Sequence, residues 1–569
     1  MHGLVRRRIS SLRTNCKLAF RLKAIVKPRK KITLSAAALA IALLLGSTAC
    51  DSSGGSGGDT SATFKSGPCP ADHAATLAAL KASCGTLTVP ENRSNLSEGK
   101  VQLPVAIIPS ATQPAQPNPI VYMSGGPGSD AISQAQILVA VGLNQNREVI
   151  IMNQRGNNDT QPLLTCPEID QFYIKAVNLP YDDPATGTMH VAATKACHDR
   201  LVAQGLDLSA FNTSENSADF ADLRTAMKIK EWDVYGLSYG TDLALSLMRD
   251  HPDGIRSVII DAVVPPSAAS LGWTWTNTNE AIDNIFRACA SQPACASQYG
   301  DLSSQFAAQV QLREATPLNI TVTAPFDNTK TVDVTLDGGA LVNWLGSVPD
   351  PVVAIPSIPA AIAQPAQGRP TQIAQARAFG ADPSGVGKIG YGLMFGVICS
   401  EWVPSEPESQ ILVQGLLAFP NYPQSVLSQP AGLPYTSQDC QVWNVPSAPA
   451  TVRQLTISTI PTLVMASSFD GKTSPQWAIN VAGTLSDSAT VVIPGAGHGA
   501  LFAFGLPDDS PARPCAKQVV ASFLANPSAP DTSCVDSLTP PPFSGSPGNL
   551  SPADLQEELN NPELFIEPY

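Results

Sequence analysis

Short apolar runs that each end at a turn recur along this chain, and their rhythm constrains the fold more than any other feature. The runs cover residues 120–123, 149–152, 232–235, 257–260, 462–465 and 490–493. Segments with a helical pattern, such as 217–227 and 241–249, lie between several of them. Strands that alternate with helices favour a mostly parallel α/β sheet. Near the start, residues 86–89 and 101–108 favour an antiparallel hairpin that opens the sheet.

The strand–helix rhythm covers residues 67–264 and 457–535 but fails between them. The intervening stretch, 265–456, is rich in Ala, Pro and Gln, and its pattern is mainly helical. We therefore expect a largely helical lid domain inserted into the sheet. The Pro-rich tail, 536–569, is expected to be loosely ordered.

Residues 1–50 have the composition of an export leader. They contain eleven Lys and Arg but no Asp or Glu, and an apolar run over 32–45 follows the basic region. That run is shorter than the about 20 residues that a spanning helix needs. Residues 46–50 resemble a bacterial lipoprotein processing site, which predicts lipidation of Cys50 and a flexible linker over 51–66. An ordinary signal peptide or an uncleaved anchor stays open, and only this leader would contact a membrane.

The rest of the chain is strongly acidic. It keeps 24 of the 35 Lys and Arg against all 47 Asp and Glu, which is a formal charge of −23. A surface of that charge repels phosphate backbones, so a nucleic-acid partner is not expected.

Cysteine usage also points outside the cytoplasm. Ten cysteines follow the leader, and their even number and close spacing suggest five local disulfides. Pairing of successive neighbours is a hypothesis, because connectivity cannot be deduced from sequence. CxxC spacing is missing, so zinc is poorly supported and no metal is expected. The ten are Cys69, Cys84, Cys166, Cys197, Cys289, Cys295, Cys399, Cys440, Cys515 and Cys534.

Residues 236–240, Gly-Leu-Ser-Tyr-Gly, fit the pattern G-x-S-x-G between a strand and a helix. In such a sharp turn, the residues two before and two after the serine must be very small. The following helix directs its N-terminal dipole at developing negative charge. We therefore expect Ser238 to be a nucleophile rather than a structural turn residue.

A serine hydroxyl needs a general base, and two histidines follow Ser238. His251 lies at the end of the next helix and suits a capping role. His498 follows the last strand in a Gly-His-Gly loop, which could present the imidazole to the serine. His498 is therefore the predicted base.

The acid that orients the base should follow the penultimate strand, one strand before the strand that leads to His498. Asp470 follows the run 462–465 and is the favoured residue. Asp487 is read as a turn residue between a helix and a strand. Asp261 also ends a strand and remains a minor alternative.

The tetrahedral intermediate of acyl transfer needs hydrogen-bond donors. Residues 124–128, Ser-Gly-Gly-Pro-Gly, follow an early strand, so backbone N–H groups of Gly125 or Gly126 and of Tyr239 are the candidates. A plain glycine turn is the alternative. The chain contains no H-E-x-x-H, Walker or G-x-G-x-x-G motif, so no cofactor is expected.

Together these residues resemble the prolyl aminopeptidase and tripeptidyl aminopeptidase family of α/β-hydrolases. The likeness extends from about Cys69 to Cys534, and residues 153–156 are similar to the family's Asp-Gln-Arg-Gly, with Asn153 in place of the Asp. The resemblance implies an α/β-hydrolase fold with a mostly parallel sheet, a helical lid and a tripeptidyl-aminopeptidase-like C-terminal domain.

The resemblance also implies an exported serine peptidase that releases tripeptides or short N-terminal residues from peptides. Family relatives can recognise the substrate ammonium with acidic residues near the lid, which makes Glu401 the first candidate and Glu215 the second. A solvated or locally paired carboxylate is an equal alternative for each. An esterase or lipase with the same triad stays open, as does a non-catalytic binding protein on a hydrolase scaffold.

Overall fold

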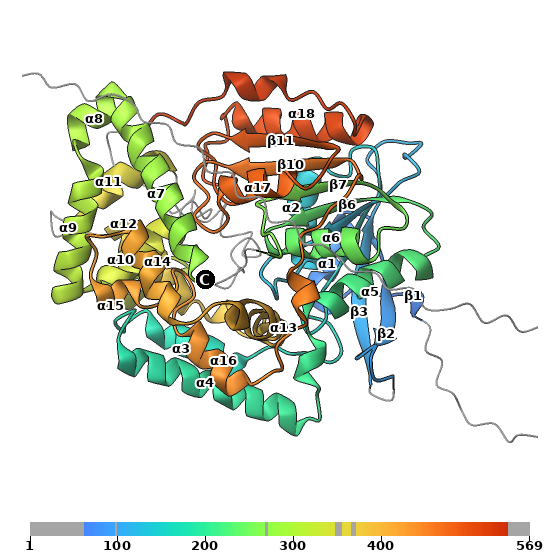
Figure 1. Ribbon diagram of the computed structural model, residues 1–569, viewed down its shortest axis with the longest axis horizontal. Helices are drawn as coiled ribbons and strands as arrows, with labels where there is room; N and C mark the ends of the chain where they lie inside the picture. The colour runs from blue at the N-terminus through green and yellow to red at the C-terminus, as the bar shows by residue number, and fades with distance from the viewer. Residues whose placement is uncertain (1–61, 97–98, 268–270, 348–354, 366–370, 544–569) are drawn as a thin grey trace, which may run out of the picture. The chain divides into compact units, whose positions relative to one another are not determined.

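The computed structural model describes residues 62–96, 99–267, 271–347, 355–365 and 371–543. The predicted leader, Cys50 and residues 51–61 of the predicted linker lie outside the described residues. At the centre is a nine-stranded sheet with strand order β1-β2-β3-β5-β4-β6-β7-β10-β11 (Figure 1). Its strands are β1 (Thr63–Gly67), β2 (Ser83–Pro90), β3 (Lys100–Ile108), β4 (Ile120–Met123), β5 (Val149–Met152), β6 (Trp232–Leu237), β7 (Ile255–Asp261), β10 (Thr462–Ser467) and β11 (Ser488–Ile493). The flexible linker was predicted to extend to residue 66, but residues 63–66 belong to strand β1, which pairs with β2.

Most of this sheet is parallel. The strands from β5 through β4, β6, β7 and β10 to β11 pair parallel, whereas β1, β2 and β3 form an antiparallel edge that joins β5. The predicted mostly parallel sheet and its opening hairpin are therefore confirmed. Parallel strands place their carboxyl ends at one edge, where ligands of open α/β sheets bind.

Both faces of the sheet are buried, since side chains alternate between two apolar layers. Val121 and Met123 of β4 pack into one layer, and Ile120 and Tyr122 pack into the other. The first layer contains side chains of α5 (Thr213–Ala226), α6 (Tyr239–Asp250) and α17 (Pro475–Ala482). The second contains side chains of α1 (Ala74–Ala79), α2 (Ala135–Ala140) and α18 (Ala512–Ala525).

The inserted lid is mainly helical but not wholly so. It also contains an antiparallel hairpin of β8 (Leu318–Ala324) and β9 (Asp327–Leu336), whose alternating Thr and Val residues suit a strand. A π-helical turn, η8 (Ile398–Trp402), follows α13. The lid helices are α7 (Trp273–Ser291), α8 (Pro293–Tyr299), α9 (Leu302–Ala315), α10 (Gly338–Ser347), α11 (Ile358–Ala363), α12 (Thr371–Ala378), α13 (Tyr391–Val397), α14 (Ser409–Ala418), α15 (Gln424–Leu427) and α16 (Thr436–Trp443).

Two helices that precede the predicted nucleophile pack with the lid instead of the sheet. These are α3 (Pro167–Ala176) and α4 (Pro184–Ala203), which Figure 1 shows beside α16. His190 of α4 lies 3.1 Å from the carboxylate of Asp439 in α16, and the Tyr435 hydroxyl donates to the Tyr181 carbonyl at 2.7 Å. The helices α3 and α4 therefore belong with the lid, although the sequence analysis placed them in the sheet domain, residues 67–264.

Five disulfides join the ten cysteines that follow the leader. They link Cys69 to Cys84, Cys166 to Cys197, Cys289 to Cys295, Cys399 to Cys440, and Cys515 to Cys534. These pairs coincide with the hypothesis that successive neighbours bond. Five disulfides favour a protein that works outside the reducing cytoplasm.

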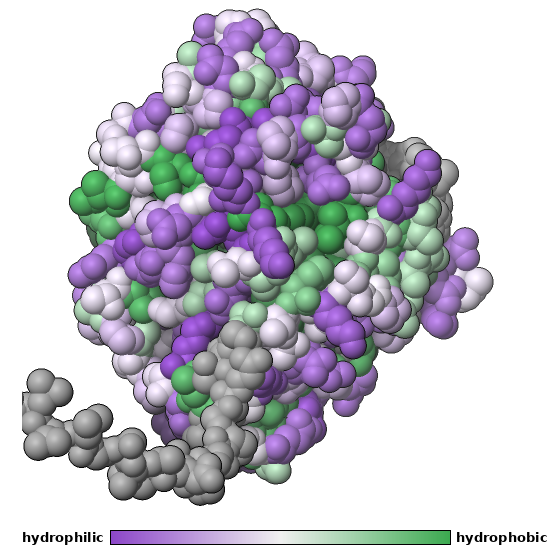
Figure 2. Space-filling model, turned by 90° about the vertical axis from the view of Figure 1, so that its right-hand side faces the viewer, coloured by the Kyte–Doolittle hydropathy of each residue, from purple (hydrophilic) through white to green (hydrophobic). Residues whose placement is uncertain are grey.

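The surface on the β1 side of the sheet carries both hydrophobic and hydrophilic residues. Figure 2 shows a band of hydrophobic residues there, bordered by hydrophilic ones. Across the described ranges, no helix combines the length and apolar character that crossing a bilayer would require.

Candidate active site

The turn between β6 and α6 presents Ser238 in a strained conformation. Its backbone has φ 56° and ψ −127°, a region that residues with a side chain rarely adopt. A Cβ atom on Gly236 would lie 2.4 Å from the Gly240 carbonyl oxygen, and one on Gly240 would lie 2.1 Å from that of Met123. Both flanking positions therefore require glycine, as expected for a nucleophile turn.

Asp470 and His498 meet at the carboxyl ends of β10 and β11. Nδ1 of His498 lies 2.8 Å from Oδ2 of Asp470, and because a carboxylate only accepts, the imidazole donates. Burial opposes ionisation of Asp470. This effect of burial is outweighed by the charge and hydrogen bond of His498, together with the hydrogen bonds from Thr473. The pKa of Asp470 therefore lies below its usual value. Nε2 of His498 is the ring nitrogen left to act as a base.

Thr473 is a site residue that the sequence reasoning did not assign a role. Its hydroxyl donates to Oδ2 of Asp470 at 2.6 Å, and its backbone N–H donates to Oδ1 at 2.8 Å. The same hydroxyl lies 3.4 Å from Nδ1 of His498. The Asp-x-x-Thr spacing at a tight turn was the available signal.

The rival acid Asp261 has a different set of partners. Its carboxylate accepts hydrogen bonds from the backbone N–H groups of Ala500 at 2.7 Å and Leu501 at 2.9 Å, and from the Tyr235 hydroxyl at 2.7 Å. Burial raises its pKa, although these bonds oppose the shift. Asp261 thus holds the loop that follows His498, whereas Asp470 contacts the imidazole.

The other two rivals lie apart from this arrangement. His251 is the C-terminal cap of α6, as its position in the sequence suggested. Asp487 precedes β11, where its backbone carbonyl accepts from Thr462 at 2.9 Å.

Ser238 opens onto a cavity of about 120 Å³ between the sheet and the lid. Gly126 and Thr473 line it from the sheet side, together with Val264 and Trp477. From the lid, α7, α10 and the segment from α13 to η8 contribute to its walls. The cavity therefore lies where the carboxyl ends of the strands, the glycine loop (residues 124–128) and the lid converge.

The glycine loop is held from both sides. Gln154 donates to the Ser124 carbonyl at 2.8 Å, and Asn157 donates to the Ser129 carbonyl at 2.7 Å. On the lid side, the Gly128 carbonyl accepts from the Gly390 N–H at 2.9 Å. Of the three predicted donor residues, Gly126 lines the cavity; Gly125 and Tyr239 do not appear in its described lining.

Asn153, which replaces an Asp of the resembled family, links two segments next to this loop. Its side-chain oxygen accepts from the Ile132 N–H at 3.0 Å, and its side-chain nitrogen donates to the Asn158 carbonyl at 2.9 Å. A neutral amide can serve both partners, whereas an ionised Asp could only accept.

One face of α7 docks onto the loop that carries Asp470. Asn277 donates to the Lys472 carbonyl at 2.9 Å, Asn284 donates to the Ser468 carbonyl at 2.7 Å, and Glu280 accepts from the Ser474 hydroxyl. Spacings of three and four residues place these side chains on one helical stripe. The lid is thereby hydrogen-bonded to residues on both sides of the acid of the candidate triad.

Neither carboxylate suggested for ammonium binding is among the described residues that line the cavity. Glu401 is buried and accepts from the backbone N–H of Thr213 at 2.9 Å and from its hydroxyl at 2.8 Å. Burial raises the pKa of Glu401 to about 7, although the Thr213 bonds oppose this shift. Glu215 instead pairs with Arg93, whose backbone N–H donates to it at 3.0 Å.

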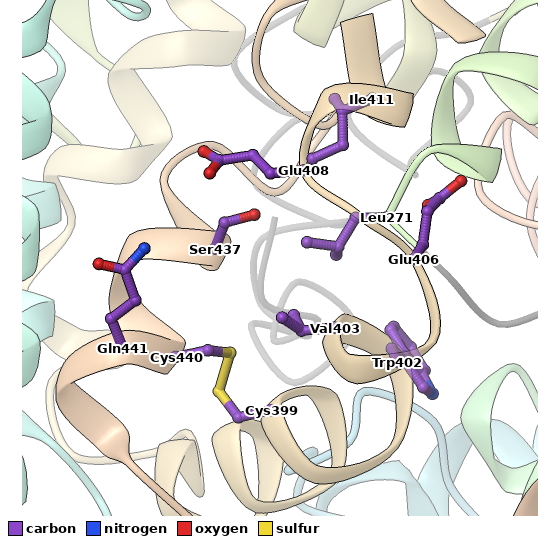
Figure 3. Close-up of a pocket in the computed structure, with 10 residues that line it drawn as sticks. All are labelled: Leu271, Cys399, Trp402, Val403, Glu406, Glu408, Ile411, Ser437, Cys440 and Gln441. Carbon is purple, nitrogen blue, oxygen red and sulfur yellow. A yellow bond between two sulfur atoms is a disulfide. The ribbon is translucent and has the colours of Figure 1, made fainter. Parts of the chain in front are cut away.

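A second pocket, of about 280 Å³, adjoins the first because Trp402 lines both. Figure 3 shows the disulfide Cys399–Cys440 at one end of this pocket and Ile411 at the other. Of its two carboxylates, Glu406 accepts from the Gly272 N–H at 2.7 Å and Glu408 accepts from Gln438 at 3.1 Å. Both acids therefore have local partners.

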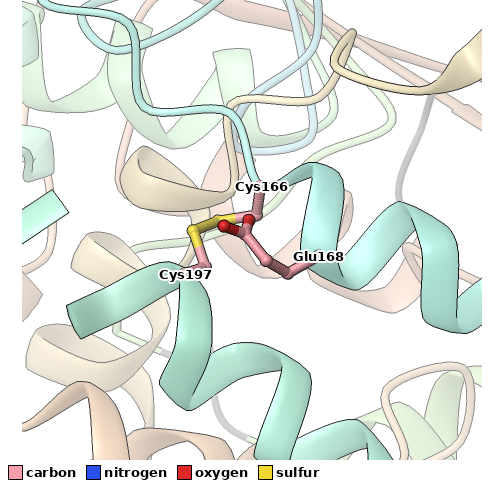
Figure 4. Close-up of side chains that lie close together, drawn as sticks. All are labelled: Cys166, Glu168 and Cys197. Atoms are coloured by element: carbon pink, nitrogen blue, oxygen red, sulfur yellow. A yellow bond between two sulfur atoms is a disulfide. The ribbon is translucent and has the colours of Figure 1, made fainter. Parts of the chain in front are cut away.

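Within the described ranges, two groups of side chains lie close enough together to hold a metal ion, and local bonds account for each. In the group of Figure 4, Cys166 and Cys197 are joined as a disulfide, so they offer no thiolate ligand. In the other, His73 lies 2.8 Å from Asp130 and 3.7 Å from Asp159.

The chain matches two family models. Residues 118–288 match the alpha/beta hydrolase fold, and residues 431–535 match the TAP-like protein family. The first match contains Ser238 and the glycine loop, and the second contains Asp470 and His498. This chain is an α/β-hydrolase with a TAP-like C-terminal part. The family and the fold expected from the resemblance are confirmed.

Two curated proteins are similar to this hydrolase over part of its length. They are the tripeptidyl aminopeptidases of Streptomyces coelicolor and Streptomyces lividans, each 25% identical over 212 residues. The match covers 35% of this chain and 38% of each relative. The matched part of the hydrolase therefore spans well under half of each relative's length.

Among solved structures, similarity extends to a proline iminopeptidase of Mycobacterium smegmatis, with 16% identity and a TM-score of 0.31 over 73% of this chain and 91% of that one. A thermophilic esterase of Thermogutta terrifontis has 14% identity and a TM-score of 0.30 over 76% and 96%. Values this low carry no information on substrate.

Proposed function

We propose that this hydrolase is an exported serine peptidase that releases tripeptides or other short pieces from the N-terminus of peptides. The observation that carries the proposal is the 2.8 Å contact of His498 with Asp470, at the strand ends beside the cavity that Ser238 lines. The tripeptidyl aminopeptidase relatives suggest the substrate class.

The proposed reaction is acyl transfer in two halves. The Ser238 hydroxyl attacks the scissile carbonyl and gives its proton to Nε2 of His498, and Asp470 stabilises the resulting imidazolium. The intermediate collapses when His498 returns the proton to the leaving amine. Water, deprotonated by the same imidazole, then hydrolyses the acyl-enzyme and restores the Ser238 hydroxyl.

Backbone N–H groups of Gly126 and Tyr239 are proposed to hold the oxyanion. Tyr239 is the first residue of α6, where the backbone N–H has no partner within the helix, and Gly126 lines the same cavity as Ser238. Gly125 remains the alternative donor on the same loop. The roles of Glu401 and Glu215 in binding an ammonium stay predictions.

Turnover of tripeptidyl anilides with a free amine tests the proposal against p-nitrophenyl butyrate as an ester control. We expect release of the intact tripeptide, seen by mass spectrometry, and loss of at least about 10³-fold in kcat for Ser238→Ala. Ester turnover without cleavage of any free-amine peptide would instead favour an esterase. A wild type that a fluorophosphonate probe does not label would favour a non-catalytic binding protein.

A further inference from the structure

The cavity beside Ser238 is lined mostly by uncharged residues, and Lys472 is the one charged residue among those described there. Valines, a methionine, a leucine and two tryptophans supply its apolar part, while Asn, Thr and Ser side chains supply most of its polar part. Among the described residues that line it, none is an Asp or Glu. A ligand with N–H groups must therefore find uncharged acceptors there.

Asn277 of α7 offers such an acceptor. Its side-chain nitrogen donates to the Lys472 carbonyl at 2.9 Å, which fixes the opposite end of the amide as the acceptor. The residue is 1% exposed, and its Oδ1 atom has no hydrogen-bond partner within the described structure. A buried carbonyl oxygen without a partner is costly, so a donor that reaches it from the cavity is favoured.

Asn343 of α10 supplies a second acceptor on the same cavity. Its Oδ1 atom is also buried without a hydrogen-bond partner in the described part of the chain. Three residues further on, Gly346 packs against the Asp470 loop, since a Cβ atom on Gly471 would lie 2.1 Å from the Gly346 carbonyl oxygen. Both asparagines are thus carried by lid helices that dock on the loop of the triad acid.

We propose that the side-chain oxygens of Asn277 and Asn343 accept hydrogen bonds from N–H groups in the acyl part of the substrate, so that the site selects peptidyl acyl groups over plain acyl groups. The inference rests on the proposed acyl transfer at Ser238 and names what the acyl pocket recognises. Neutral oxygens bind an amide N–H without the desolvation cost of a buried carboxylate.

A pair of activated esters tests this binding without requiring peptide-bond cleavage. N-acetyl-alanine p-nitrophenyl ester carries the N–H, and O-acetyl-lactic acid p-nitrophenyl ester has an oxygen in its place. We expect wild type to show kcat/KM at least about tenfold higher for the alanine ester, because the lactate leaves a buried acceptor unpaired. Asn277→Leu and Asn343→Leu should each lower kcat/KM more for the alanine ester than for the lactate ester, so that the ratio of the two falls toward one.

Asn284→Leu is the matched control, because Asn284 docks α7 on the Asp470 loop but does not line the cavity. It should lower both esters by the same factor and preserve their ratio. A wild-type ratio near one overturns the proposal, since water rather than substrate would then satisfy these oxygens. Equal loss for both esters in Asn277→Leu and Asn343→Leu also overturns it. If the ester ratio holds but no peptide is cleaved, the peptidase proposal alone fails.

Discussion

The backbone carbonyl of Asp261 accepts a hydrogen bond from the N–H of Ser238 at 3.0 Å. The carboxylate of the same residue accepts from the N–H groups of Ala500 and Leu501, which lie two and three residues beyond His498 in the chain. One residue at the end of β7 therefore joins the predicted nucleophile turn to the loop of the predicted base. Its role is to position these two groups, and it leaves Asp470 to contact the imidazole.

Asp261→Asn should lower kcat by about 10- to 100-fold with little change in KM, because an amide can accept only through its single oxygen and must turn a donor toward one of the N–H groups. It also removes a negative charge that attracts the His498 imidazolium. The pKa of His498 should therefore fall, and the acidic limb of the kcat/KM profile should move to lower pH.

Tyr235→Phe is the control for this experiment, since it removes one hydrogen bond to Asp261 without removing the charge. Its acidic limb should stay at the wild-type pH. An Asp261→Asn enzyme with wild-type kcat and an unmoved limb would show that Asp261 has no influence on the triad.

Thr473→Val should lower kcat by about tenfold or more. The change preserves side-chain shape but removes the hydroxyl that donates to Oδ2 of Asp470 at 2.6 Å, and hydrogen bonds to charged groups contribute about 1.5–3 kcal/mol. That bond lowers the pKa of Asp470, so its loss should raise the pKa and weaken activity further at acidic pH. Steady-state kinetics from pH 5 to 8 measures both effects.

Thr473→Ser keeps the hydroxyl and should recover most of the lost kcat. Failure of the serine variant to recover activity would mean that the methyl group, through packing, matters more than the hydrogen bond.

The candidate triad could be predicted because its signals are local. The glycines at 236 and 240 are forced by contacts within one turn, and chain order leaves His498 as the histidine after the last strand. The sequence favoured Asp470 over Asp261 as the acid of the triad less firmly, because both residues lie at the ends of parallel strands that share one edge of the sheet. Only the three-dimensional path of the His498 loop decides which carboxylate contacts the imidazole.

The lid was harder to predict, because its contacts link distant parts of the chain. The packing of α4 on α16 joins His190 to Asp439, and no pattern within either helix reveals that partner. The β8–β9 hairpin was missed although β8 alternates between apolar and polar residues, because the Ala-, Pro- and Gln-rich composition of the surrounding segment favoured a helical prediction. Asn277 gave no signal either, since its place in the cavity wall arises only where several distant segments meet in the folded chain.

Glu401→Gln should reduce the loss of folding stability that occurs as the pH rises from about 4.5 toward 7. Burial raises the pKa of Glu401 from 4.5 to about 7, so the folded state holds this proton more tightly than the unfolded chain does. Its contribution to stability is complete below about pH 4.5 and is lost as the pH rises toward 7. The variant should therefore gain apparent Tm relative to wild type between pH 5 and 8, by a few degrees.

The same variant tests whether Glu401 binds substrate. If its carboxylate holds the ammonium of a peptide, KM for free-amine substrates should rise by about tenfold or more at pH 8 while N-acetylated substrates are unaffected. An unchanged KM together with the shifted pH dependence of Tm would assign Glu401 to the buried contact with Thr213.

Removal of the Cys399–Cys440 disulfide should impair both stability and substrate binding. Cys399 lies in η8, whose residues Ile398 and Trp402 line the cavity, and the disulfide ties this turn to α16. The linked residues are 41 positions apart, against six for Cys289–Cys295, so chain entropy predicts about 2 kcal/mol more stabilisation for the longer loop. Replacing both Cys399 and Cys440 with Ser should lower Tm and raise KM several-fold, whereas the same change at Cys289 and Cys295 should lower Tm less and leave KM unaltered. Equal KM values for the two double variants would show that η8 keeps its place in the cavity wall through packing alone.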